Sequence, residues 1–77
     1  MNAEEMFKKL GYKKEELDDH IYYELGDIGE KTITFTNYKY GTHTIDVSEW
    51  HYDAGFITVE ELQAINQQCK ELGWLDE

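Results

Sequence analysis

The last segment of the chain constrains the fold more than any other part of the sequence. Thr58 and Glu61 form the T-x-x-E pattern of a helix-capping box, and Gly73 stands where a helix begun there would end. Ile57 and Leu62 occupy the two positions of a hydrophobic staple around this start. Apolar side chains then recur at helical spacing and form one stripe: Leu62, Ile65, Cys69 and Leu72. The pattern predicts an amphipathic C-terminal helix, which needs a second element to cover its apolar face.

A shorter helix is predicted near the N-terminus. Asn2 can cap it, Glu5 stands three residues later, and Gly11 fits the position that ends it. The apolar side chains between them have helical spacing: Ala3, Met6, Phe7 and Leu10. Four lysines are expected at its C-terminal end, where cations interact favourably with the helix dipole: Lys8, Lys9, Lys13 and Lys14. A solvent-exposed helix end explains this cluster without a binding role.

Three strands are predicted between the helices. Residues 20–25 are rich in β-forming side chains and are followed by a glycine-containing turn. In residues 31–37 and again in residues 42–47, apolar and polar side chains alternate, as in half-buried strands. Short connections favour antiparallel pairing. We therefore expect an α+β fold of the order α-β-β-β-α, a single small domain over residues 1–77. Its three-stranded antiparallel meander would have the N- and C-terminal helices packed on one face.

The charge of the chain argues against nucleic-acid binding. Its 77 residues include 17 acidic side chains, 7 lysines and no arginine, for a formal net charge of -10. Lysine and arginine supply most of the affinity for phosphates, so we expect no direct binding to DNA or RNA. Residues 15–30 hold seven acids and no base, and residues 49–77 hold seven acids against one lysine. These two acidic blocks predict either a solvating surface, which is the commoner outcome, or a surface that attracts a basic protein.

Aromatic residues provide a second indication of an interaction surface. They are more numerous than the predicted elements can easily bury, and consecutive residues such as Tyr22 and Tyr23 must point to opposite faces of a strand. Tyrosine and tryptophan are common at interfaces because they combine apolar area with a polar group. A filled core with a few exposed tyrosines explains the same residues. Charge and aromatic pattern together select these candidate partner-binding residues: Glu15, Glu16, Asp18, Asp19, Tyr22, Tyr23, Tyr38, Tyr40 and Trp50.

Metal binding is a weaker prediction. His20, His43, His51 and Cys69 occur singly, without the spacing by which zinc sites take two ligands from one element. Residues 50–62 match an EF-hand loop at its glycine and glutamate positions, but three positions that need oxygen ligands are Trp, Tyr and Ala. We therefore expect no calcium, no other metal and no cofactor. The alternative is a small metal-binding or catalytic protein that uses the three histidines and nearby carboxylates.

The remaining features favour a non-enzymatic protein in a reducing compartment. A single cysteine cannot form an intramolecular disulfide, and its phase with the apolar stripe predicts a small buried side chain. No G-x-S-x-G, glycine-rich phosphate loop or H-E-x-x-H is present. No signal-peptide pattern opens the chain, and no apolar run approaches the ~20 residues that cross a bilayer. We therefore expect a cytoplasmic protein with no membrane role and no enzymatic activity.

The two ends of the chain resemble a known group of proteins. The opening reads A-E-E-M-F-x-x-L-G-Y over residues 3–12, and the closing reads I-T-x-E-E-L-x-A-I-N over residues 57–66 and E-L-G-W-L over residues 71–75. Both resemble small uncharacterised prophage-encoded proteins of Gram-positive bacteria (Firmicutes). The resemblance implies a phage or prophage accessory protein that acts in the cytoplasm of its bacterial host. It carries over no catalytic or ligand-binding residue.

Taken together, these patterns lead us to expect an acidic protein-interaction module that binds an unidentified protein partner. It would be a monomer or a homodimer, the latter formed through an aromatic face of the sheet. A sharper hypothesis is inhibition of a nucleic-acid-binding enzyme by charge mimicry, in which the acidic blocks imitate a phosphate array. A self-associating phage structural or assembly component is a further alternative.

Overall fold

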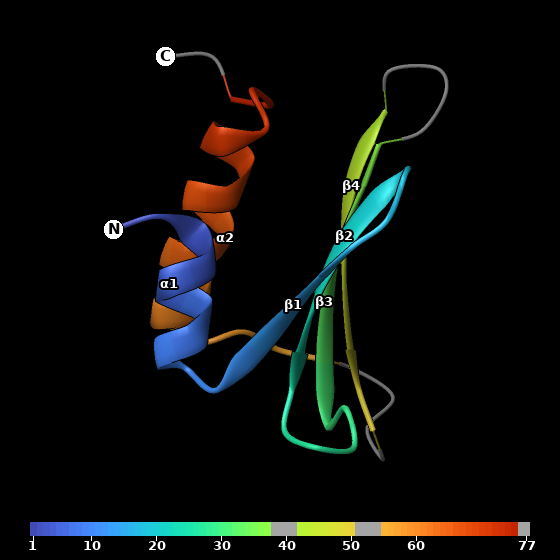
Figure 1. The fold of residues 1–77 in the computed structure, drawn as a ribbon, viewed down its shortest axis with the longest axis vertical. Helices are drawn as coiled ribbons and strands as arrows, with labels where there is room; N and C mark the ends of the chain where they lie inside the picture. The colour runs from blue at the N-terminus through green and yellow to red at the C-terminus, as the bar shows by residue number, and fades with distance from the viewer. Residues whose placement is uncertain (38–41, 51–54, 76–77) are drawn as a thin grey trace.

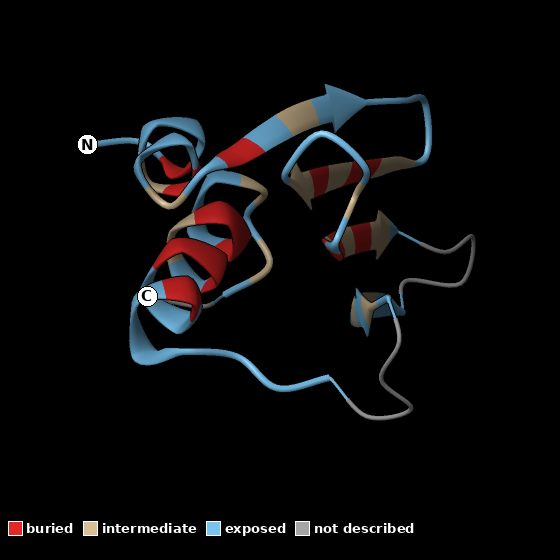
Figure 2. Ribbon diagram, turned by 90° about the horizontal axis from the view of Figure 1, so that it is seen from below, coloured by how far each residue is buried: buried red, intermediate tan, exposed pale blue. Residues whose placement is uncertain are grey.

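In the part of the chain that the structure describes, residues 1–37, 42–50 and 55–75, two helices pack on a four-stranded sheet (Figure 1). The structure is a computed structural model. Neighbouring strands pair antiparallel in the order β1-β2-β3-β4, and both helices lie on the same side of the sheet (Figure 2). In chain order the elements are α1 (Ala3–Lys9), β1 (Tyr12–Glu16), β2 (His20–Leu25), β3 (Lys31–Asn37), β4 (His43–Glu49) and α2 (Val59–Glu71).

The α+β class and the antiparallel sheet between two helices are confirmed, but the predicted number of three strands is wrong. The strand that the prediction lacks is β1, and it includes Lys13 and Lys14, which the sequence pattern places at the end of the first helix. Its sequence, YKKEE, has one large apolar side chain, Tyr12, so charged residues hide the alternation of a half-buried strand. β1 is an edge strand, where charged side chains are favourable because they discourage pairing with other chains.

Both predicted helix starts are confirmed. In α1 the Asn2 side chain accepts a hydrogen bond from the Glu5 backbone N–H at 2.8 Å, and in α2 the Thr58 hydroxyl accepts one from the Glu61 N–H at 3.0 Å. In each box the glutamate carboxylate accepts a hydrogen bond from the N–H of the capping residue in return. Among the described residues, neither helix has the length and apolar content to cross a membrane.

The buried face of α2 differs from the predicted stripe at one position. Leu62 is wrong as a core residue, because it is 52% exposed. Successive residues are about 100° apart around a helix axis. Because Glu61 points toward the core, Leu62 lies on the side of the helix, away from the core. Leu72 remains partly buried against the core. The buried residues of α2 are Glu61, Ala64, Ile65, Gln68 and Cys69.

The core lies between the helices and the inward face of the sheet. The β2–β3 register pairs Ile21 with Phe35 and Tyr23 with Ile33, so these four side chains share that face. Phe7 of α1 stacks on Tyr23 with ring centroids 3.9 Å apart. This aromatic contact places α1 directly over the sheet, and the largest fully buried side chains are Tyr23, Phe7, Phe35 and Ile33.

Neither helix covers the opposite face of the sheet (Figure 2). Thr32, Thr34 and Thr36 of β3 point to it, because the residues between them point into the core. Tyr22 pairs with Thr34 across the β2–β3 ladder and therefore shares this face. The helix-free side of the sheet thus presents hydroxyl groups and a half-buried tyrosine, as the strand pattern predicts.

Candidate functional site

Four of the predicted acidic residues lie together on the β1–β2 hairpin. Its turn is closed by a hydrogen bond from the Leu17 N–H to the His20 carbonyl at 2.8 Å. Within the described part of the chain, none of the four carboxylates forms an ion pair with a lysine. All four residues are exposed: Glu15, Glu16, Asp18 and Asp19. We call this set the acidic hairpin; no described lysine neutralises its negative charge through an ion pair.

One member of the acidic hairpin has a histidine partner. Asp19 Oδ1 lies 2.7 Å from His20 Nδ1, and this hydrogen bond lowers the pKa of the Asp19 carboxyl below its usual value. The Asp19 backbone carbonyl also accepts a hydrogen bond from the Asn37 N–H at 3.2 Å. The turn is therefore tied to β3, and the Asp19 carboxylate stays ionised.

Most of the described acids in the second acidic block are engaged within the fold. Glu49 and Glu61 turn inward, where their carboxylates lie 3.2 Å and 2.8 Å from Lys31 Nζ. Glu71 accepts a hydrogen bond from the Ala3 N–H at 2.8 Å and so joins the end of α2 to the start of α1. Three further acids of this block lie outside the described residues: Asp53, Asp76 and Glu77. Three carboxylates of the block are thus used to hold the fold together.

Lys31 is the centre of an inward-facing polar network. Its side chain is 9% exposed, and its ammonium group also donates a hydrogen bond to the Phe56 carbonyl. Burial alone would lower the pKa of Lys31, but hydrogen bonds to Glu61 and Glu49 outweigh it and raise that pKa. Burial alone would raise the pKa of Glu61, but hydrogen bonds from Lys31 and Tyr12 lower it. Burial is the largest cause of a raised pKa at Tyr12, and the hydrogen bond to Glu61 is the second. We interpret this satisfied network as structural.

The same network explains the segment that partly matches an EF-hand. Both carboxylate oxygens of Glu61 are in use, Oε1 by Lys31 and the helix cap and Oε2 by Tyr12. A Cβ added at Gly55 would lie 3.2 Å from the Val47 carbonyl oxygen, so glycine is favoured there by close approach to β4. The glutamate that would bind calcium through both oxygens is therefore already engaged.

Those predicted aromatic residues that the structure describes do not gather on one surface. Tyr22 is half-buried on the helix-free face of the sheet. Tyr23 is not available for binding, which corrects the prediction: strand alternation points it into the core, where its hydroxyl donates a hydrogen bond to Gln68. Trp50 is 56% exposed, but it follows β4 at the end of the sheet away from the acidic hairpin (Figure 1). Two predicted residues lie outside the described ranges: Tyr38 and Tyr40.

The described histidines and the cysteine do not converge. His20 and His43 point to opposite faces of the sheet, because they pair with adjacent residues of β3. His43 stacks on Trp74, with ring centroids 4.5 Å apart and an interplanar angle of 9°. Cys69 is buried, and burial raises the pKa of its thiol. Residues 1–37, 42–50 and 55–75 contain no group of three His, Cys, Asp or Glu placed to hold a metal ion, and His51 lies outside them.

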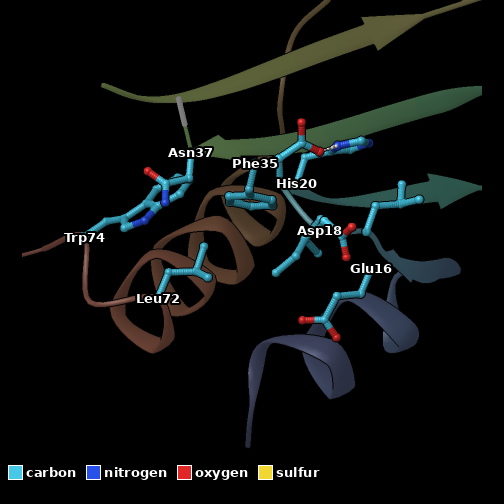
Figure 3. A pocket seen from close by; sticks show the side chains of 10 residues that line it. Glu16, Asp18, His20, Phe35, Asn37, Leu72 and Trp74 are labelled. Atoms are coloured by element: carbon cyan, nitrogen blue, oxygen red, sulfur yellow. Dashed lines mark hydrogen bonds and ion pairs between the residues drawn. The ribbon is translucent and has the colours of Figure 1, made fainter. Parts of the chain in front are cut away.

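A cleft of about 340 Å³ opens between the acidic hairpin and the C-terminal end of α2 (Figure 3). Carboxylates of Glu16 and Asp18 lie toward one side, and the apolar side chains of Leu72 and Trp74 lie toward the other. Ten residues line the cleft: Glu16, Leu17, Asp18, Asp19, His20, Ile21, Phe35, Asn37, Leu72 and Trp74. Such a site suits a ligand group that has both an apolar part and a positive charge.

Trp74 belongs to this cleft and is absent from the predicted site. α2 ends in a Schellman motif, in which Gly73 has φ 75° and donates to the Lys70 carbonyl at 3.1 Å, while Trp74 donates to the Cys69 carbonyl at 2.9 Å. The motif turns the chain back, so that the Trp74 and Phe35 ring centroids lie 6.3 Å apart. A glycine that ends a helix signals this turn in the sequence, but the hairpin opposite Trp74 comes from a distant segment.

No protein-family model, curated protein or solved structure matches the chain. The site is therefore interpreted from its own residues. Its two components are the acidic hairpin and the cleft that the hairpin shares with the end of α2.

Proposed function

We propose that this protein is a non-enzymatic interaction module that binds a basic surface of a partner protein through the acidic hairpin. The observation that carries the proposal is the set of four exposed carboxylates without a lysine partner among the described residues. Lys14, on the same strand, points to the helix side and lies 3.8 Å from Glu4. Concentrated charge of one sign accelerates association with an oppositely charged surface and selects against negatively charged partners.

The partner class that we favour is a nucleic-acid-binding enzyme. Such proteins present lysine and arginine side chains that neutralise phosphates, and clustered carboxylates compete for the same groups. The protein would then inhibit its partner by charge mimicry, occupying a surface that otherwise holds DNA or RNA. Because the carboxylates are exposed, this binding should weaken as salt screens them; the Debye length falls to about 8 Å at physiological ionic strength.

A prophage origin and a location in the bacterial cytoplasm form part of the same proposal. Their support is the resemblance of the two terminal segments to prophage-encoded proteins. A phage-encoded inhibitor would meet nucleic-acid enzymes of its host in that compartment. A monomer or a homodimer is compatible with this role, since the acidic hairpin is exposed in the single chain.

The proposal is tested with two variants that lose the same number of negative charges at different places in the chain. The hairpin variant carries Glu15→Gln, Glu16→Gln, Asp18→Asn and Asp19→Asn. The control variant loses four charges elsewhere, through Glu24→Gln, Asp27→Asn, Glu30→Gln and Asp46→Asn. Each protein is immobilised, exposed to a bacterial lysate at low salt and washed, and the bound proteins are then eluted with DNA.

Wild type and control variant should capture the same nucleic-acid-binding proteins and release them to DNA, whereas the hairpin variant should lose them. Equal capture by the two variants, or no basic protein bound by the wild type, would contradict the proposal. Two further measurements separate it from the alternatives raised by the sequence. Metal analysis with a chelator's effect on Tm tests metal binding, and light scattering over a concentration range tests self-assembly.

A further inference from the structure

We propose that the cleft beside the acidic hairpin receives an arginine side chain of the basic partner. This inference rests on the proposed function, because it names the chemical group that the acidic surface would recognise. It is based on a juxtaposition: a wall that carries carboxylates faces a wall made of aromatic and aliphatic side chains (Figure 3). Neither wall alone would distinguish arginine from other ligands.

The carboxylate wall suits the charged end of arginine. Glu16 and Asp18 are exposed and have no lysine partner in the described chain. Asp19 also lines the cleft, but its carboxylate is engaged by His20 at 2.7 Å, so Glu16 and Asp18 are the acceptors that remain free for a ligand. A guanidinium group presents five N–H donors in a planar fork and often binds carboxylates through two hydrogen bonds at once. These residues therefore offer more acceptors than a single ammonium group would use.

The apolar wall suits the rest of the arginine side chain. Phe35 is buried at the base of the cleft, and Leu72 and Trp74 are half-buried above it. The methylene groups of arginine can pack on such surfaces while its charged end stays near solvent. A guanidinium plane can also stack on an aromatic ring, which adds a favourable contact that an ammonium group makes less well. The volume of about 340 Å³ is at the small end for ligand sites and fits one side chain.

A lysine or arginine is missing from the described lining of the cleft. The chain contains no arginine, and no described lysine lines the cleft. Lys14 pairs with Glu4, and Lys31 is held in the buried network with Glu49 and Glu61. The described residues thus place no lysine or arginine in this cleft, and its one histidine, His20, is engaged by Asp19.

Other ligand classes fit the cleft less well. An anion would be repelled by the carboxylates, and a purely apolar group would desolvate them without compensation. The described residues offer no set of three ligands for a metal ion. Lysine carries the charge but lacks the planar fork and the stacking surface, so it should bind more weakly than arginine.

Both walls are held in place by contacts within the fold. Trp74 is fixed by the Schellman motif and by its stacked contact with His43 at 4.5 Å. On the other side, the hydrogen bond from the Asn37 N–H to the Asp19 carbonyl anchors the turn to β3. A site whose side chains are already ordered loses less conformational entropy on binding.

The test uses ¹⁵N–¹H correlation spectra of the intact protein titrated with Nα-acetyl-arginine N-methylamide. The matched probe is the citrulline analogue, which has nearly the same shape but no charge. Arginine should shift the signals of residues 16–21, 35–37 and 72–75, the lysine analogue should do so at higher concentration, and citrulline should not. Equal shifts with citrulline, or arginine shifts spread over all acidic segments, would overturn the inference.

Two single variants locate the binding group. Asp18→Asn removes a charge from the cleft and should weaken arginine binding roughly tenfold, as expected for the loss of one charge-assisted hydrogen bond. Asp46→Asn removes the same charge from the helix-free face of β4 and should change the affinity by less than about twofold, because the carboxylate is distant and screened. Both positions are exposed, so both variants should fold. Equal effects of the two substitutions would overturn the assignment to the cleft.

Failure of this inference can be told apart from failure of the proposed function. If the lysate partner is lost with the hairpin variant but arginine produces no shift at the cleft, the cleft assignment is wrong and the proposed function stands. If arginine binds in the cleft but no basic protein is captured from the lysate, the cleft assignment stands and the proposed function is wrong.

Discussion

Replacement of Lys31 by methionine tests whether the buried polar network holds α2 on the sheet. Lys31 comes from β3, Glu49 from β4 and Glu61 from α2, so one ammonium group joins three elements. Methionine keeps much of the apolar stem but removes the charge. The Glu49 and Glu61 side chains, 11% and 8% exposed, would then face each other without a cation.

The expected loss is a large part of the total stability. Removing one partner from a buried ion pair costs about 3–5 kcal/mol, because the remaining charge is left uncompensated in a poorly solvated site. A chain of this length has a free energy of unfolding of about 4–12 kcal/mol at typical values per residue. Lys31→Met should therefore lower the urea midpoint strongly or prevent folding altogether.

The measurement is urea denaturation at neutral pH followed by far-ultraviolet circular dichroism. Lys13→Met is the matched control, because Lys13 is exposed on β1 and forms no ion pair within the described residues; its cost should stay within about 0.5 kcal/mol. The double variant Lys31→Met with Glu61→Gln removes one of the two carboxylate charges left without a cation, and it should recover part of the lost free energy of unfolding. A cost below about 1 kcal/mol for Lys31→Met would refute the reasoning, since it would mean that the network contributes little.

Three further predictions concern pH and packing. Folding lowers the pKa of Glu61, so the contribution of its carboxylate to the free energy of unfolding is present above the ordinary glutamate pKa of about 4.3 and is lost as pH falls through the lower folded value. Glu61→Gln should therefore flatten the acid side of a plot of the free energy of unfolding against pH. An unchanged acid side would contradict this prediction. Folding raises the pKa of both Lys31 and Tyr12, so their contributions are present below about pH 10 and decline as pH rises through the folded values. Gly55→Ala should lower the free energy of unfolding by about 1 kcal/mol, because the added Cβ would lie 3.2 Å from Val47 Cγ1 and 3.2 Å from the Val47 carbonyl oxygen. An unchanged or higher urea midpoint would contradict this, because it would show that β4 can shift to accommodate the methyl group.

Local signals predicted the helices well and the sheet incompletely. The capping boxes at Asn2 and Thr58 act within four residues of the chain, so short-range pattern is sufficient to find them. β1 has no comparable local signal, because Tyr12 is its only large apolar residue and the strand forms through pairing with β2. Leu62 also shows that local pattern is insufficient. Its spacing fits the apolar stripe, but it is exposed because the polar network around Glu61 sets the rotation of α2 about its axis.

The candidate site was predictable only on its acidic side. The run of carboxylates from Glu15 to Asp19 is visible in the sequence, and the structure places it on one exposed hairpin. Tyr23 was predicted for the same surface, yet it is buried, because alternation along β2 shows that two neighbours differ in direction but not which of them faces the helices. The apolar wall around Trp74 had no local signature of a site, since its partner residues are distant in the sequence.

The sequence by itself determined where the helices begin, that a sheet lies between them, and that the chain has a net charge of -10. These properties depend on neighbouring residues or on composition. Only the tertiary structure decided which carboxylates become surface and which become internal. Glu61 and Glu49 are drawn inward because Lys31 meets them from β3, whereas the acidic hairpin has no described cation opposite it. The sign of a charge is a property of the residue, but whether it is available to a partner depends on what the fold brings beside it.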